Sequence, residues 1–129
     1  MPQVGIVLVS HSARLAEGAA DLAAQVGGGT VTVLAAGGTD DGGLGTSADK
    51  VARALHSAEA GAGVLVLPDL GSAVLTVRAL LADLTGASVV LADAPFVEGA
   101  VAATVTAAAG ANLTAVAEAA EEAWHARKL

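Results

Sequence analysis

Short apolar runs alternate with segments of helical spacing along the whole chain. The first run, from Ile6 to Val9, is β-branched and apolar, which is typical of a strand buried on both faces. Predicted strands lie at 3–9, 31–35, 63–67 and 88–91, and predicted helices at 13–26, 47–60, 71–85, 97–109 and 112–126. This rhythm predicts an α/β fold with a mostly parallel open sheet and helices on both faces.

The order of the strands follows from the handedness of the connections. Right-handed crossovers between parallel strands favour the order 2-1-3-4, which places the first and third strands side by side. In such a sheet, ligands and chemistry gather at the carboxyl ends of the strands. The chain has 129 residues and shows no linker or longer repeat, so we expect a single domain over residues 1–129.

The composition argues against several classes of protein. The net charge is −7, the six Lys and Arg residues are scattered, and aromatic residues make up only 2%, so neither duplex nor single-stranded nucleic acid is an expected partner. The absence of cysteine excludes disulfides and thiolate metal sites. The three histidines lie too far apart for a metal-ligand spacing, so we expect no metal and no bound cofactor.

No segment has the character of a membrane span or a signal peptide. The first three residues lack a basic start, and the uncharged stretch 99–117 is mostly Ala, Thr and Gly and is broken at 110–112. We therefore expect a cytoplasmic protein with no membrane contact.

The candidate reactive group is His11, which stands between the first predicted strand and the helix after it. The predicted strand order brings it opposite Asp69 and Ser72, which follow the third strand. An imidazole with one nitrogen held by a carboxylate is a nucleophile through its other nitrogen. We therefore assign catalytic roles to His11, Asp69 and Ser72. Structural alternatives are a hydrogen-bonding histidine, a turn aspartate and a helix-capping serine.

Helix starts beside His11 could bind a phosphate. Their unpaired N–H groups attract anions, each end contributing roughly 0.3–1 kcal/mol, and hydroxyl groups add donors. The predicted phosphate-binding residues are Ser10, Ser12, Gly71 and Thr46. The glycine-rich loop at 36–45 has neither the lysine of a Walker loop nor the position of a dinucleotide fingerprint. It is long for such a connection, which is typical of functional loops.

Several local interpretations complete the picture. We expect an apolar helix side made of Leu15, Ala19, Leu22 and Val26. Helix starts are predicted at a Thr46–Asp49 capping box, at Ser72 and at Asn112, and Gly86 is predicted to end a helix. We place His56 on a polar helix face, pair His125 with Glu121, and place Trp124 in the core or in a subunit contact.

Four motifs in order carry a family resemblance over nearly the whole chain. They are GIVLVSHSARLAEG at 5–18, AGGT with LGTS at 36–39 and 44–47, DLGSA at 69–73, and APFVEGAVAAT at 94–104. The chain resembles the DhaM family, the phosphotransferase subunits of bacterial dihydroxyacetone kinase. It is also similar to the mannose-type enzyme IIA of the sugar phosphotransferase system, with the same α/β fold. The Gly-Thr loop and the Val-Glu-Gly-Ala segment favour DhaM.

The resemblance implies a phosphoryl relay. His11 matches the family's phosphorylated histidine, which receives its phosphoryl group from phospho-HPr and passes it to ADP bound on DhaL. The ATP so formed phosphorylates dihydroxyacetone held on DhaK. Asp69 matches the acidic neighbour of the histidine, and Ser72 the hydroxyl at the next helix start. The family also implies a homodimer, with Trp124 and the fourth strand as contributors.

Three other functions remain open at this point. A mannose-type enzyme IIA would use the same histidine but pass the group to an enzyme IIB. A hydrolase using Ser72 or Ser10 is disfavoured because the sequence lacks the Gly-x-Ser-x-Gly elbow. A non-catalytic module would bind phosphorylated ligands through the glycine loop, without any covalent phosphate.

Overall fold

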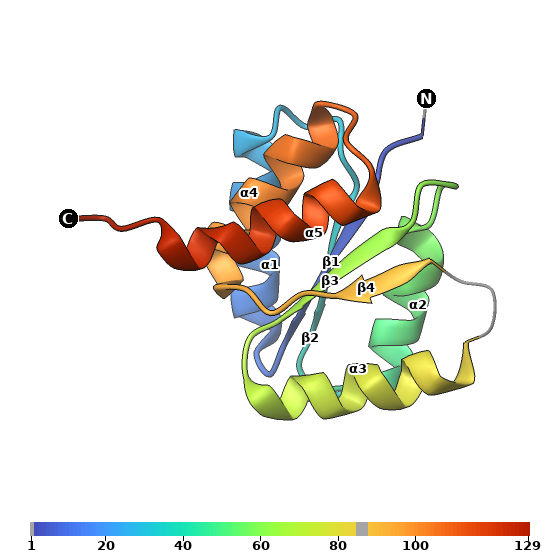
Figure 1. Cartoon of the computed structure of the whole chain (residues 1–129). Helices are drawn as coiled ribbons and strands as arrows, with labels where there is room; N and C mark the ends of the chain where they lie inside the picture. The colour runs from blue at the N-terminus through green and yellow to red at the C-terminus, as the bar shows by residue number, and fades with distance from the viewer. Residues whose placement is uncertain (1, 85–87) are drawn as a thin grey trace.

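A four-stranded parallel sheet forms the centre of the computed structural model, which describes residues 2–84 and 88–129. The strands are β1 (Gly5–Ser10), β2 (Val33–Gly37), β3 (Val64–Pro68) and β4 (Val89–Leu91). Their order is β2-β1-β3-β4, and each neighbouring pair is parallel (Figure 1). The predicted fold class and strand order are confirmed. Each strand begins one to two residues later than predicted.

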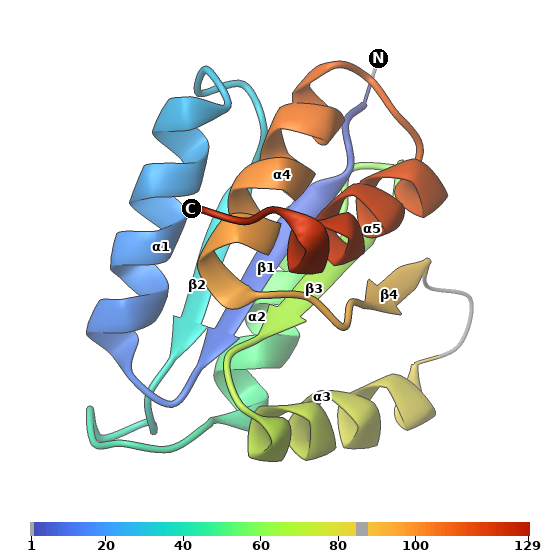
Figure 2. The same ribbon diagram turned by 60° about the vertical axis from the view of Figure 1, so that its left-hand side comes forward.

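Helices cover both faces of this sheet. They are α1 (Ala13–Val26), α2 (Ala48–Ala58), α3 (Gly71–Asp83), α4 (Phe96–Ala108), α5 (Leu113–Glu122) and a 3₁₀ turn η1 (Ala123–His125). The first, fourth and fifth helices pack against Ile6, Leu8, Leu65 and Leu67 on one face of the sheet. The other two pack on the opposite face, against Val7, Val9, Val64 and Val66 (Figure 2). None of these helices, within the described residues, is long and apolar enough to cross a bilayer.

The side of α1 that faces the sheet differs from the predicted one. Leu15, Leu22 and Val26 are 44%, 46% and 53% exposed. The buried side consists instead of small residues, namely Ala16, Ala19, Ala20 and Ala23. Small side chains let α1 lie close to both β2 and α4, and the larger leucines remain on the outer surface.

Two of the three predicted helix caps are wrong. Ser47, not Thr46, begins α2 and accepts a hydrogen bond from the backbone N–H of Lys50, 3.1 Å away. The N-terminal cap of α3 is Leu70, with no side-chain bond, so Ser72 lies within the first turn. Asn112 caps α5 as predicted. The predicted end of the third helix at 85–86, with Gly86 as its exit residue, lies outside the described residues.

The carboxyl end of β2 approaches the start of α1 so closely that glycine is required. A Cβ on Gly37 would lie 2.5 Å from the backbone oxygen of Ser12 and 2.9 Å from the Cβ of Ala16. We expect Gly37→Ala to lower the free energy of unfolding by about 1–3 kcal/mol, because the added methyl group would force the backbone at the start of α1 to shift. Urea unfolding of the variant and the wild type measures this difference. Gly18→Ala is the control: that position is open, and we expect it to gain about 0.5–1 kcal/mol from helix propensity.

Candidate active site at the carboxyl edge of the sheet

His11 lies in the connection between β1 and α1. Ser10 is the last residue of β1, and Ser12 caps α1 by accepting a hydrogen bond from the backbone N–H of Leu15. The backbone oxygen of His11 accepts a hydrogen bond from the N–H of Gly45, 2.9 Å away. The connection is therefore held from both sides, while the imidazole keeps 25% of its surface exposed. A reactive side chain needs both properties, because it must be held in a fixed geometry and still be accessible to its reaction partner.

Asp69 is brought to His11 by strand pairing. It follows β3, and its backbone N–H donates to the carbonyl of Val9 on β1 at 2.9 Å. Its carboxylate is 8% exposed and accepts four hydrogen bonds. Oδ1 accepts from His11 Nδ1 at 2.9 Å and from the Leu70 N–H at 2.7 Å, and Oδ2 accepts from the Ser10 hydroxyl at 2.9 Å and the His11 N–H at 3.0 Å.

These contacts fix the charge of Asp69. Burial raises the pKa of the carboxyl, but the hydrogen bonds from His11, Ser10 and Leu70 lower it by more. The pKa of Asp69 therefore lies below its ordinary value of 3.8, and the group is ionised at neutral pH. An ionised carboxylate can only accept, so the proton of the neutral imidazole resides on Nδ1.

The second ring nitrogen of His11 is thus an acceptor. Its partner is the hydroxyl of Ser72, with 2.6 Å between Nε2 and Oγ. With the proton on Nδ1, the hydroxyl must be the donor. Ser72 lies in the first turn of α3 and not at its cap, so its hydroxyl is not used to cap the helix. The lone pair of Nε2 is therefore directed away from Asp69 and toward the start of α3.

The predicted phosphate-binding residues occupy different positions around this pair. Ser10 is fully buried, donates to Asp69 and accepts from the N–H of Ser12 at 3.0 Å, so it supports the carboxylate. Ser12 uses its hydroxyl as the helix cap, and Gly71 is the exposed first residue of α3. Thr46 contacts the hydroxyl of Thr76 on α3 at 2.8 Å instead of His11. Their roles toward phosphate stay predictions.

Contacts of the glycine-rich loop were not foreseen from the sequence. The loop reaches His11 through the backbone N–H of Gly45 and reaches α3 through the Thr46–Thr76 pair. Ser47 also donates to Asp40 within it. The length of the loop was the signal in the sequence that pointed to a functional role. The contact from Gly45 could not be predicted, because it is made by a backbone N–H and does not depend on the residue type.

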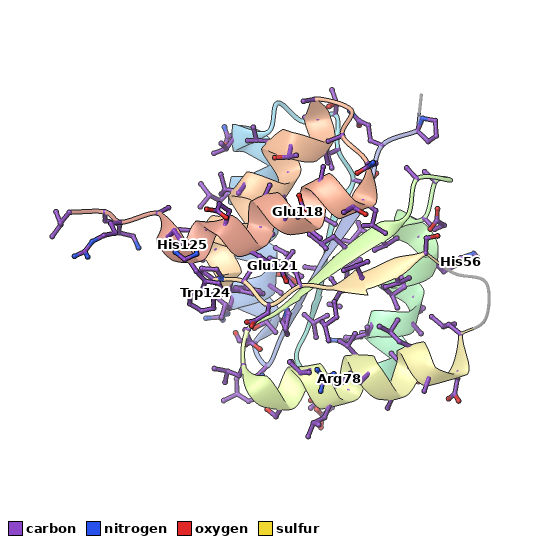
Figure 3. All side chains as sticks on the ribbon, viewed as in Figure 1. His56, Arg78, Glu118, Glu121, Trp124 and His125 are labelled. Atoms are coloured by element: carbon purple, nitrogen blue, oxygen red, sulfur yellow. The ribbon has the colours of Figure 1, made fainter. Side chains whose placement is uncertain are left out.

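The other two histidines lie away from this site. Figure 3 places His56 and His125 at opposite sides of the molecule, and both are exposed. The predicted His125–Glu121 pair is wrong: no ion pair joins these two described residues, and Glu121 instead accepts from the backbone N–H of Asp93. In the ranges 2–84 and 88–129, no three His, Cys, Asp or Glu side chains are grouped to hold a metal ion.

Trp124 does not belong to the core. Its ring is 60% exposed, and its indole N–H donates to the backbone oxygen of Asp93 at 3.0 Å. Figure 3 shows it at the same side of the molecule as His125. The interpretation as a core residue is therefore wrong, and a subunit contact stays a prediction.

Fold and site together define a class: parallel α/β proteins that hold a histidine–aspartate pair at the carboxyl ends of two adjacent central strands. Within this class, the chain belongs to the EIIA-man family, described as the PTS system fructose IIA component, whose family model matches residues 5–117.

Curated relatives carry a more specific name. The chain is 42% identical over 132 residues to the "PEP-dependent dihydroxyacetone kinase, phosphoryl donor subunit DhaM" of Klebsiella michiganensis, covering 98% of this chain and 28% of that protein. It is 36% identical over 114 residues to the "PTS-dependent dihydroxyacetone kinase, phosphotransferase subunit DhaM" of Lactococcus lactis, covering 88% of this chain and 90% of that protein. The chain thus spans under a third of the first relative and most of the second.

A solved structure shares the fold. A crystal structure described as that of "unknown function protein EF1359" matches with a TM-score of 0.82 and 33% identity, covering 93% of this chain and 94% of that one.

Proposed function

We propose that this chain is a phosphoryl carrier of a phosphoenolpyruvate-dependent dihydroxyacetone kinase. In this proposal His11 accepts a phosphoryl group from phospho-HPr and passes it to ADP bound on DhaL. The ATP formed there then phosphorylates dihydroxyacetone held on DhaK. The names of the curated relatives support it. The observation that carries it is the pair of contacts on the His11 ring, with Nδ1 held by Asp69 and Nε2 directed outward to Ser72.

The proposed uptake step uses one lone pair and leaves the ring proton in place. Nε2 attacks the phosphorus of the donor, the bond from phosphorus to the donor nitrogen breaks, and the donor keeps that electron pair. The ring of His11 then carries both a phosphoryl group and the Nδ1 proton, and is formally cationic. The ionised Asp69 stabilises this cation through the hydrogen bond to Nδ1.

The release step is the reverse displacement onto a different acceptor. A terminal phosphate oxygen of ADP attacks phosphorus, the bond to Nε2 breaks, and the neutral ring returns with its proton on Nδ1. The protein positions the group and balances its charge, and no cofactor of its own takes part. Ser72, Ser12 and the N–H groups at Gly71 are the proposed donors to the phosphoryl oxygens. This chemistry takes place in the cytoplasm, where we place the relay.

We also propose a homodimer, as the family resemblance implies. Among residues 2–84 and 88–129, the short strand β4 pairs only with β3 and forms one edge of the sheet. The exposed ring of Trp124 lies beside the segment that leaves β4, since it contacts Asp93. Both features would contribute to the subunit contact.

A sugar-transport enzyme IIA is the second candidate, and the description of the matching family as a PTS system fructose IIA component favours it. Both candidates use His11 as the carrier, so the acceptor distinguishes them: DhaL with ADP in one case and an enzyme IIB in the other.

The test follows the phosphoryl group through the relay. The chain is incubated with phosphoenolpyruvate, enzyme I and HPr, and its intact mass is measured before and after addition of DhaL–ADP. We expect one acid-labile phosphate on the chain, followed by its loss and the appearance of ATP. Retention of the phosphate with DhaL–ADP but loss to an enzyme IIB would establish the second candidate. No uptake from competent phospho-HPr would contradict both and favour a non-catalytic binding module.

A further inference from the structure

Thr46 and Thr76 form a hydrogen bond between two segments that are far apart in the sequence. Their hydroxyl oxygens lie 2.8 Å apart, 30 residues separate them, and both side chains are half-buried. Thr46 lies in the β2–α2 loop and Thr76 lies in α3. Figure 2 shows this loop running beside the first turns of α3. The chemistry proposed for His11 uses no atom of Thr76, so this bond requires an explanation of its own.

A threonine inside a helix has a potential partner in its own helix, which Thr76 does not use. Its hydroxyl can donate to the backbone oxygen one turn earlier, as Thr104 does to Ala100 in α4 at 2.7 Å. The corresponding acceptor for Thr76 would be the backbone oxygen of Ser72. Across the described residues, the hydroxyl of Thr76 hydrogen-bonds only to that of Thr46. The side chain of Thr76 therefore joins α3 to the loop.

The first turns of α3 are held to the rest of the molecule by few other contacts. Only Ala73 and Val77 are buried in α3, whereas α4, also 13 residues long, buries five residues. The N-terminal cap of α3, Leu70, makes no side-chain hydrogen bond. A helix with few buried side chains shifts more easily than a well-buried one. The bond from Thr76 to Thr46 is therefore a substantial part of what fixes the start of α3.

The Thr46–Thr76 bond closes a ring of contacts around the imidazole of His11. On one side, Gly45 precedes Thr46 and donates its N–H to the backbone oxygen of His11 at 2.9 Å. On the other side, Ser72 lies one helical turn before Thr76, and its hydroxyl lies 2.6 Å from Nε2 of His11. The backbone of His11 and the partner of its reactive nitrogen are thus joined to each other through the two threonines.

We propose that Thr76 is a positioning residue for phosphoryl transfer at His11. Through Thr46, it holds the Ser72 hydroxyl in a fixed place relative to Nε2, so that a phosphoryl group arriving at this nitrogen meets a hydrogen-bond donor already in position. The inference rests on the proposed function, since it requires that His11 accept a phosphoryl group. The effect of Thr76 passes through its hydroxyl and not through contact with the reacting atoms.

The test measures the rate of His11 phosphorylation in Thr76→Val, which removes the hydroxyl and keeps the shape of the side chain. Two donors are used: phospho-HPr, and phosphoramidate, a small molecule that releases ammonia when an imidazole takes its phosphoryl group. Because misplacing reacting groups by about 1 Å costs up to roughly 10²-fold in rate, we expect Thr76→Val to slow uptake from both donors by about 10–100-fold. Loss of a contact with the donor protein would slow uptake from phospho-HPr alone.

Three further variants identify the hydroxyl and the route by which it acts. Thr76→Ser keeps the hydroxyl, and we expect it to restore most of the rate. Thr106→Val is the matched control, since Thr106 is a half-buried threonine on α4, and its rate should equal that of the wild type. In a Thr46→Val background, Thr76→Val should cause no further loss, because the two hydroxyls form a single bond.

A spectroscopic readout tests the position of Ser72 without any phosphoryl transfer. The NMR chemical shift of the Nε2 nitrogen in the unphosphorylated chain depends on whether the Ser72 hydroxyl donates to it. We expect Thr76→Val to move this shift toward the value found in Ser72→Ala, while circular dichroism reports a folded protein. Thr106→Val should leave the shift at the wild-type value.

The outcomes separate the positioning role from the proposed function. If phosphoramidate labels the wild type and Thr76→Val keeps either the wild-type rate or the wild-type Nε2 shift, the positioning role is overturned while the carrier function stands. The role is likewise overturned by a loss of rate that is confined to phospho-HPr, that Thr76→Ser does not restore, or that recurs in the Thr46→Val background. If neither donor labels the wild type, the carrier function itself fails, and the positioning role fails with it.

Discussion

Replacement of His11 by alanine should abolish covalent phosphate on the chain. Nε2 of His11 is the nucleophile in the proposed relay, and Ser10 and Ser72 cannot replace it. The Ser10 hydroxyl is fully buried and donates to Asp69, and the Ser72 hydroxyl has no base once the imidazole is removed. Intact-mass analysis after incubation with phosphoenolpyruvate, enzyme I and HPr should therefore show the unmodified mass alone.

A matched control distinguishes this loss from a general effect of removing an imidazole. His56→Ala removes an exposed histidine in the last turn of α2, which makes no contact with His11 or Asp69, and should leave phosphate uptake at the wild-type level. The label on the wild type should be lost in acid, as expected of a phosphorus–nitrogen bond. An acid-stable label would mean that an oxygen and not a ring nitrogen carries the group. A label that persists in His11→Ala would mean that another side chain carries it, and either result would show that the assignment of His11 is wrong.

Asp69→Asn should leave the shape of the site in place but reduce the rate of phosphoryl uptake by up to roughly 10⁴-fold, the loss found when an aspartate that orients a catalytic histidine becomes an amide. Asparagine can turn its NH₂ group toward Nδ1, which would hold the proton on Nε2 and occupy the lone pair required for attack. It also removes the negative charge that stabilises the cationic phosphoimidazole.

The pH dependence of this variant separates positioning from folding. Because the pKa of Asp69 lies below its ordinary value of 3.8, the wild-type carboxylate stays ionised across neutral and mildly acidic pH. Its contribution to stability is therefore present above that value and is lost only as the pH falls through the lowered pKa. The defect of Asp69→Asn in phosphoryl uptake should thus persist throughout the neutral and mildly acidic range, while circular dichroism reports a folded protein.

Asp21→Asn provides the control, since Asp21 is exposed on α1 and the substitution changes the net charge by the same amount. Its uptake rate should match that of the wild type. An Asp69→Asn variant that takes up phosphate as fast as Asp21→Asn would show that the carboxylate only satisfies the backbone N–H groups of His11 and Leu70 and the hydroxyl of Ser10. That was the structural alternative for this residue, an aspartate that stabilises a turn.

The strand order was predictable because it depends on patterns that are local in the chain. The apolar run from Ile6 to Val9 and the helical spacing after Ala13 each arise from a few consecutive residues. A parallel sheet with right-handed crossovers leaves few arrangements for four such units. That constraint brings the ends of β1 and β3 together, so the proximity of His11 and Asp69 followed from topology before any distance was known.

Other features were decided only by the packing of distant segments. The spacing of the larger apolar residues predicted the wrong side of α1, and the alanine side is buried because only small residues fit against β2 and α4. Ser72 satisfied the pattern of a helix cap, yet its hydroxyl contacts a ring 61 residues away in the chain. Thr46 satisfied the pattern too, but pairs with Thr76 on another helix.

The sequence by itself therefore determined the alternation of strands and helices, their order and the proximity of His11 to Asp69. The tertiary structure alone decided which hydroxyl groups meet the imidazole and which face of α1 is buried. The physical reason is that periodicity records whether a side chain prefers water, whereas a hydrogen bond depends on the positions of atoms to within a few tenths of an ångström. Those positions are fixed only when all layers pack together.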